Sequence, residues 1–273
     1  MVIGMALARS LLAATLLSFF AVEADAPAAE PDRVEARFEI YGFLGFHVLT
    51  NRTKVEESGD RYSVTMDLDT RGLASVFVNL ISHSQVHGSF ARAATHPEAY
   101  HSDVVRNGVE RHYKVDYRGD GTVVNASAPP PSGRPFVVSA DQMHGSVDQL
   151  TAYFVVERQL ARSGTCTMTV RVFDGSGLYN LRFTDLGSET LSADGHQLFA
   201  GPSEVCDVVR QDIVVNPNRN EDTYQHGKIW YARVIAGDLM LPVRMEFDTA
   251  FGIVHGYLAE LHGRGADLRL ARD

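Results

Sequence analysis

The segment SGTCTMTVRVFDGSGLYNLRFTDLG, residues 163–187, contains the pattern that decides the fold. Apolar and polar residues alternate on both sides of the pair Asp174-Gly175. Alternation with period two is typical of a half-buried strand, and an Asp-Gly pair between two such runs favours a tight turn. The segment therefore predicts a β-hairpin, and it also holds Cys166, one of the two cysteines of the chain.

The same alternation recurs along most of the chain. In RYSVTMDLDT, residues 61–70, every second side chain from Tyr62 to Leu68 is apolar, and the residues between them are polar. In VVRNGVERHYKVDY, residues 104–117, the pair Asn107-Gly108 separates two alternating runs, which predicts a hairpin with a type I′ turn. The pattern predicts a mainly β protein whose large antiparallel sheet curls into an open barrel or β-spiral and so hides its edges.

Two segments favour helix over strand. HGSVDQLTAYFVVERQLARSG, residues 144–164, has the capping-box spacing at Ser146 and Gln149 and a stop at Gly164. GLASVFVNLISHSQVHGSF, residues 72–90, fits a short helix that leads into a strand, although periodicity alone does not decide this. We therefore expect one or two helices.

The first thirty residues have the order of a secretory signal peptide. Arg9 is the only charge before the apolar run Leu11–Val22, and small residues follow that run. The run is about a dozen residues long, whereas a membrane span needs roughly twenty. We expect a signal peptide over residues 1–26, with Ala24, Ala26 or Ala29 before the cleavage site; the alternative is an uncleaved anchor.

The remaining residues, 27–273, fit one β-rich domain without an integral membrane segment. The proline-rich stretch that follows residue 125 leaves open a division into 27–125 and 146–273. The formal net charge of −9, without a basic stripe, argues against nucleic acid and anionic lipid as primary partners.

Cys166 and Cys206 make an even number of thiols without a C-x-x-C motif. In an exported protein this favours a disulfide between them. The alternative is a reactive thiol, which would need a neighbouring base that lowers its pKa.

Recognisable catalytic patterns are missing from the sequence. The chain contains no G-x-S-x-G, S-x-x-K or H-E-x-x-H motif, and DGSG lacks the lysine of a phosphate-binding loop. We therefore expect no enzyme activity, no metal site and no cofactor. The alternative is an undetected hydrolase or metal enzyme, which requires His83, His87, His96 and His101 to converge in a cleft.

Aromatic residues recur along the strands, and they either fill the core or line a groove. A curled sheet of this size can enclose a ligand cavity. We expect a groove that holds a lipid or an apolar peptide. Its candidate lining residues are Phe43, Phe46, Phe154, Tyr179, Phe183 and Phe247.

Several segments, taken in order, resemble the uncharacterised bacterial periplasmic proteins known as domain of unknown function 3108. One matching segment departs from the pattern of that family, because Gln149 stands where the family usually has proline. The similar segments are YGFLGFHV (41–48), RYSVTMDLDTRGL (61–73), HPEAY (96–100), SVDQLTAYFVV (146–156), CTMTVRVFDGSGLYNLRF (166–183), GPSEVC (201–206) and LPVRMEFDTAFGIVHGYL (241–258).

The resemblance implies a periplasmic, mostly β protein without an established enzyme activity. We expect a cell-envelope protein that acts as a non-enzymatic scaffold for a lipid or an apolar peptide and supports envelope integrity. Its partner would be a lipid or an envelope protein. The alternative is a structural or protein-interaction factor without a small ligand.

Overall fold

The computed structural model describes residues 32–70, 79–91, 94–127, 137–214, 216, 225–237, 239–249 and 252–270, all within the compact unit Pro31–Asp273. The predicted signal peptide lies outside the described residues. Within them, no helix is long and apolar enough to cross a membrane.

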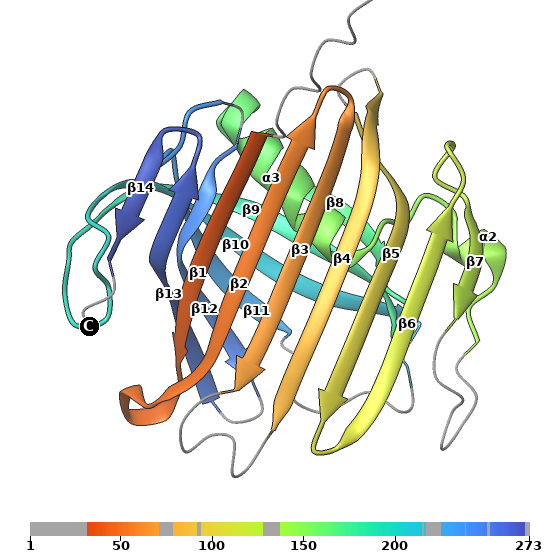
Figure 1. Cartoon of the computed structure of the whole chain (residues 1–273), viewed down its shortest axis with the longest axis horizontal. Coiled ribbons are helices and arrows are strands. Elements are labelled where there is room, and N and C mark those ends of the chain that lie inside the picture. Colours follow the sequence, from red (N-terminus) through yellow and green to blue (C-terminus); the bar gives the residue numbers. More distant parts are fainter. Residues whose placement is uncertain are drawn as a thin grey trace, which may run out of the picture. The chain divides into compact units, whose positions relative to one another are not determined.

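One antiparallel 14-stranded sheet dominates the structure, which confirms the predicted fold class (Figure 1). The first seven strands are β1 (Asp32–Tyr41), β2 (His47–Ser58), β3 (Arg61–Thr70), β4 (Leu80–Ala91), β5 (Ala94–Arg106), β6 (Val109–Tyr117) and β7 (Val123–Ser127). The others are β8 (Met168–Phe173), β9 (Leu178–Leu191), β10 (Gly201–Val214), β11 (His226–Ala232), β12 (Leu241–Thr249), β13 (Gly252–Gly263) and β14 (Ala266–Arg269).

The sheet is built from two meanders that meet at β1 and β13. Its order is β7-β6-β5-β4-β3-β2-β1-β13-β12-β11-β10-β9-β8, and β14 pairs with β13. The first described strand thus lies in the middle of the sheet, from which the strands follow outward to β7 and then return from β8 at the other end. In the described pairings, β7 and β8 remain the two edges of an open sheet.

Local sequence explains the hairpin turns and the end of the main helix. Asn107 and Gly108 have φ values of 50° and 76°, as the predicted type I′ turn requires. The predicted hairpin around Asp174-Gly175 joins β8 to β9. The predicted helix is α3 (Gln149–Ser163), and it ends at Gly164 with φ 72°.

The start of α3 differs from the prediction. Asp148, not Ser146, caps the helix, because its carboxylate accepts the Thr151 N–H at 2.9 Å and the Thr151 hydroxyl at 2.7 Å. Ser146 instead donates to the Met143 carbonyl at the end of the short helix α2 (Ala140–Met143). The expected helix at the start of 72–90 falls on residues 71–78, outside the described residues, and residues 80–91 form β4.

The sheet has two arms, strands β1–β7 and strands β8–β13. Helix α3 fills the space between them (Figure 1). Leu150 and Phe154 pack into a large hydrophobic core to which strands β1 to β13 contribute, whereas Val156 and Leu160 pack into a second, smaller core with β8 to β11. All four side chains are buried. The alternating apolar residues therefore point inward, as predicted, but the interior is occupied by a helix.

Cys166 and Cys206 lie at disulfide distance, with an Sγ–Sγ separation of 2.05 Å and a Cα–Cα separation of 6.3 Å. Both are fully buried in the second core. The bond ties the segment between α3 and β8 to β10, across β9. It therefore holds the edge of the sheet beside the helix.

Candidate functional site

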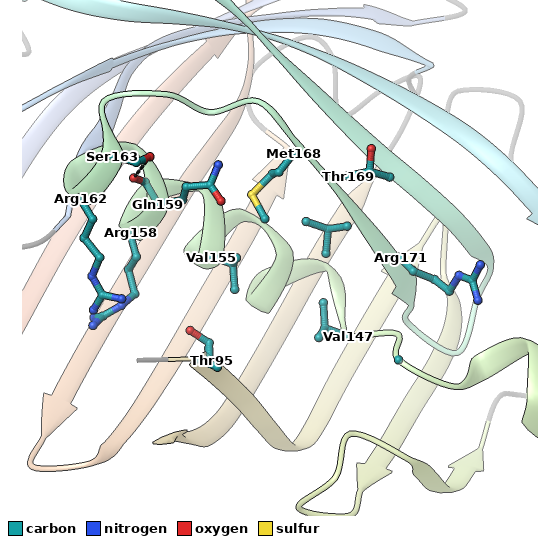
Figure 2. Close-up of a pocket in the computed structure, with 13 residues that line it drawn as sticks. Thr95, Val147, Val155, Arg158, Gln159, Arg162, Ser163, Met168, Thr169 and Arg171 are labelled. Carbon is teal, nitrogen blue, oxygen red and sulfur yellow. Dashed lines mark hydrogen bonds between the residues drawn. The ribbon is translucent and has the colours of Figure 1, made fainter. Parts of the chain in front are cut away.

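A cleft of about 490 Å³ lies between α3, the edge strand β8 and the start of β5 (Figure 2). Val155 of α3, Met168 and Val170 of β8, and Val147 before the helix provide its apolar surface. The alternation on β8 places Met168 and Val170 half-buried, while Thr169 and Arg171 are exposed. Both α3 and β8 therefore line the cleft with apolar as well as polar side chains.

Strand β8 is unevenly paired along its outer edge. On that side the Val147 N–H donates to the Arg171 carbonyl at 3.0 Å, and the Phe173 N–H donates to the Val147 carbonyl at 2.8 Å. Because peptide groups alternate in direction along an antiparallel strand, Thr169 turns its N–H and C=O to the same side as Arg171 and Phe173. Within the described residues, no backbone partner meets Thr169 there.

The charged side chains that line the cleft, among the described residues, are arginines, although the chain is acidic. The part of its lining that the structure describes includes Arg158 and Arg162, one turn apart on α3, and Arg171 on β8, but no carboxylate. Arg158 is anchored, since its Nη1 lies 2.8 Å from Glu57 Oε1 and its guanidinium stacks 4.2 Å from the centre of the Phe90 ring. The amide of Gln159 donates to the carbonyls of Thr165 and Thr167 and fixes the connection to β8.

A buried polar cluster holds the N-terminal end of α3. The Tyr62 and Thr151 hydroxyls lie 3.3 Å apart, and the Ser84 and Ser102 hydroxyls lie 2.8 Å apart. Burial raises the pKa of Asp148 to about 6, although this carboxyl accepts hydrogen bonds from Thr151. Burial and the nearby Asp148 carboxylate also raise the pKa of Tyr62 well above its ordinary value. These side chains are sealed from solvent, so they position the helix that forms the cleft wall.

The four histidines considered in the sequence do not line the cleft. His83, His87 and His101 are exposed on β4 and β5, and His96 is half-buried on β5. His83 contacts Asp67 at 2.7 Å and His101 contacts Asp103 at 2.9 Å. In the described part of the chain, no group of three or more His, Cys, Asp or Glu side chains could hold a metal ion.

The predicted groove residues do not gather in one place, and none with a described side chain lines the cleft. Phe154, Tyr179 and Phe183 are buried in the packed cores, Phe247 packs against the second core, and Phe46 is exposed. The side chain of Phe43 lies outside the described residues. Alternation identifies the inward face of a strand, but it does not tell whether the enclosed space is filled.

Sequence reasoning missed Arg158, Arg162, Thr169 and Arg171. The arginines four residues apart in the predicted helix were a visible signal, because this spacing places both on one face. The position of β8 at an edge was not visible in the sequence, because pairing partners are set by the whole topology.

Comparison with known proteins agrees with the resemblance seen in the sequence. The family model described as "Protein of unknown function (DUF3108)" matches residues 37–259. No curated protein matches the chain. Among solved structures, the chain is similar to a beta-barrel-like protein of domain of unknown function DUF1849 from Brucella abortus, at 11% identity and a TM-score of 0.49. That match covers 86% of this chain and 99% of the other. The protein thus belongs to the DUF3108 family.

Proposed function

We propose that the protein is an exported, non-enzymatic scaffold of the cell envelope that holds an extended acidic polypeptide segment in the cleft between α3 and β8. The observation that carries this proposal is the open edge of β8 at Thr169 in a cleft whose lining includes the exposed Arg162 and Arg171. Periplasmic localisation is supported by the apolar run Leu11–Val22 and by the Cys166–Cys206 pair.

Strand addition explains how such a segment would bind. A peptide alongside β8 exchanges main-chain hydrogen bonds with Thr169, and alternate side chains of the peptide face opposite sides. One set meets the apolar surface at Val155 and Met168. The arginines attract carboxylates, and a guanidinium can pair with a carboxylate through two parallel hydrogen bonds. The bridge between Val147 and Val172 limits the added strand to the first part of β8.

A peptide suits this structure better than a lipid does. The aromatic side chains expected to line a lipid groove are largely packed into the cores around α3. Thr95, Ser163 and Thr169 line the cleft, and no histidine or carboxylate stands beside them among the described lining residues. This composition supports binding rather than catalysis. Support of envelope integrity would follow from holding an envelope protein at this site.

The test is a fluorescence-anisotropy titration of the mature protein with a labelled peptide of alternating glutamate and valine. We expect saturable binding that weakens with added salt, and no binding of the matched lysine-valine peptide. Thr169→Pro removes the outward amide without loss of a β9 hydrogen bond, and we expect it to lower the affinity at least about tenfold.

The charge contribution is tested with Arg162→Glu and Arg171→Glu. We expect each to weaken the acidic peptide. Arg118→Glu makes the same charge change in the exposed turn before β7 and serves as the matched control. Equal binding of the acidic and basic peptides, or no effect of the cleft variants, would reject the proposal. A complete lack of peptide binding would favour a structural role.

A further inference from the structure

Large apolar side chains gather at one end of the strands. Among the described residues, nine large hydrophobic side chains are exposed, and five of them form what we name the apolar rim. These five are Leu44 (75% exposed), Phe46 (56%), Ile81 (52%), Val109 (52%) and Ile253 (51%). The other four are scattered over β7, β9, β10 and the segment before α2.

Strand register places the apolar rim at a single level of the sheet. Tyr41, the last residue of β1, pairs with His47 of β2 and with His255 of β13. The start of β4 pairs with the end of β5, and Arg106 there pairs with Val109 across the next turn. In Figure 1 these ends all lie along the lower side of the sheet, where the short helix η1 (Phe43–Gly45) joins β1 to β2.

The turns at the opposite ends of the same strands have a different composition. They consist of glycine and charged residues at Gly59-Asp60, Arg118–Gly121 and Gly263–Gly265. Among the described residues, the exposed large apolar side chain next to these turns is Val124 at the start of β7, whereas five lie at the other end of the strands. Scattered single apolar residues are ordinary on protein surfaces, but a set at one level indicates an interaction surface.

The backbone conformation of Leu44 also favours an interaction surface. Its φ of 59° lies in the left-handed region, which a leucine adopts only at an energetic cost. Its side chain is also the most exposed of the five, so it contributes little to folding. Asparagine would fit this backbone better. An exposed leucine at this position therefore favours a role in binding over a role in stability.

Amphipathic rings lie directly above the apolar rim on the outer face. The Tyr41 ring stacks on His196 at 3.6 Å, and the Tyr257 ring lies 6.0 Å from Tyr41. Tyrosines are enriched at the water interface of membranes, where the ring is half-buried and the hydroxyl stays wet. Beside these rings the Glu39 carboxylate is paired with Arg37 and contacts His47 at 2.6 Å, so its charge is compensated by the arginine.

We propose that the apolar rim docks on the surface of a lipid bilayer, with its side chains inserted to the level of the headgroups and Tyr41 and Tyr257 above them. A bilayer fits because the side chains project from the turn between β1 and β2 and from the starts of β4, β6 and β13, at the same end of the sheet and beside an interfacial tyrosine belt. With a net charge of −9, the protein favours zwitterionic over anionic lipid. This surface is distinct from the cleft and independent of the peptide proposal.

The first test is co-sedimentation of the mature protein with vesicles of phosphatidylcholine and phosphatidylethanolamine. A second set of vesicles contains phosphatidylglycerol in place of part of the phosphatidylcholine. We expect binding to the zwitterionic vesicles that resists added salt, and weaker binding to the anionic ones. The triple variant Leu44→Asn, Phe46→Ser, Ile253→Ser should lose at least about tenfold in vesicle affinity.

The matched control removes the same number of exposed apolar side chains elsewhere, as Val124→Ser, Leu186→Ser, Ile213→Ser. It should bind within about twofold of the wild type. Thermal unfolding of both triple variants checks that the fold is kept. A second readout uses Phe46→Trp, whose emission should shift to the blue on vesicles, while that of Leu186→Trp should not. Trp230 is buried and gives a constant background.

Two results would overturn the proposal. One is wild-type protein that stays in the supernatant with both kinds of vesicle. The other is a rim variant that binds vesicles as the wild type does. If the rim variant instead abolishes a concentration-dependent dimer seen by light scattering, the apolar rim is a contact between two copies of the chain.

Discussion

Arg158 of the interior helix and Glu57 at the end of β2 form an ion pair of 2.8 Å with little exposure to solvent. The second oxygen of Glu57 lies 2.9 Å from Nη2 of Arg264, in the turn between β13 and β14. Both arginine side chains are less than one-tenth exposed. One carboxylate therefore connects the cleft wall to β2 and to the turn between β13 and β14.

Replacement of this carboxylate should be costly. Glu57→Gln removes a carboxylate that two mostly buried guanidinium groups share, while Arg264 keeps its contact with Asp32 at 2.8 Å. We expect a loss of about 3 kcal/mol in the free energy of unfolding, mainly from Arg158. Urea denaturation measures this. The control is Glu35→Gln, whose partner Arg33 is about half exposed, and it should cost less than about 0.5 kcal/mol. Equal losses in the two variants would contradict the structural role of Glu57.

The disulfide should contribute strongly to stability. Cys166 and Cys206 are 40 residues apart, and closing a loop of that length stabilises the folded state by about 4 kcal/mol in the chain-entropy model. The double variant Cys166→Ala, Cys206→Ala should therefore unfold at markedly lower urea concentration. A reductant should destabilise the wild type but leave the double variant unchanged. Insensitivity of the wild type to reduction would argue that the bond contributes little.

Much of the architecture could be predicted because period-two alternation and turn residues act locally. Asn107-Gly108 and Asp174-Gly175 each specify a turn by their own backbone preferences, so the sequence alone reveals those hairpins. The pairing of β1 with β13 could not be predicted in this way, because no local pattern records which distant strands become neighbours. The same reason hid the cleft, whose open edge at Thr169 exists only because β8 ends the sheet.

The position of α3 inside the curled sheet is a second feature that could not be predicted from the sequence. Leu150, Phe154 and Leu160 were visible as the apolar positions of a helix, but an apolar stripe does not show which surface covers it. In the structure, α3 packs against both arms of the sheet and occupies the space in which a ligand groove was expected. The aromatic residues Phe154 and Phe183 are consequently packing residues.

Close packing makes Gly88 a sensitive position. It lies at a bulge between β4 and β5, where an added Cβ would be 2.2 Å from the His96 carbonyl oxygen and 2.7 Å from the Tyr62 ring. Gly88→Ala should therefore destabilise the protein by roughly 2–4 kcal/mol, because backbone and ring must both shift. Gly119→Ala, with no atom within 4 Å, should be close to neutral in the same thermal unfolding experiment. A neutral Gly88→Ala would show that the bulge is looser than described.

The buried cap Asp148 should make stability depend on pH. Its folded-state pKa of about 6 lies above the ordinary 3.8, because burial favours the protonated carboxyl. The stability that the protonated Asp148 gives the folded protein is fully present below pH 3.8 and is lost as the pH rises through 6. Asp148→Asn keeps an acceptor for Thr151 and removes the titration. Relative to the wild type, the variant should gain on the order of 3 kcal/mol between pH 4 and pH 7, measured by urea denaturation at each pH.

The control for this titration is Asp120→Asn. Hydrogen bonds from Thr122 lower the pKa of the Asp120 carboxyl, so its contribution is present above pH 3.8 and is lost as the pH falls. The relative stability of Asp120→Asn should thus change with pH in the opposite direction. If both variants showed the same slope, the burial of Asp148 could not be the cause.

His226 on the outer face of β11 lies between two aspartates. Its Nδ1 lies 2.9 Å from an oxygen of Asp248 and its Nε2 lies 2.7 Å from an oxygen of Asp207, and these contacts raise the pKa of the imidazole above 6.5. The stability gained when the protonated imidazole pairs with these two aspartates is present below pH 6.5 and is lost as the pH rises through the folded-state pKa. Because the ring is about half exposed, solvent screening keeps the effect on stability below about 1 kcal/mol. NMR titration of the ring protons measures the shift directly. Asp248→Asn and Asp207→Asn should each lower the pKa of His226. Asp141→Asn on α2 is the control and should leave it unchanged. An unchanged pKa in both Asp248→Asn and Asp207→Asn would mean that the two aspartates do not hold the ring.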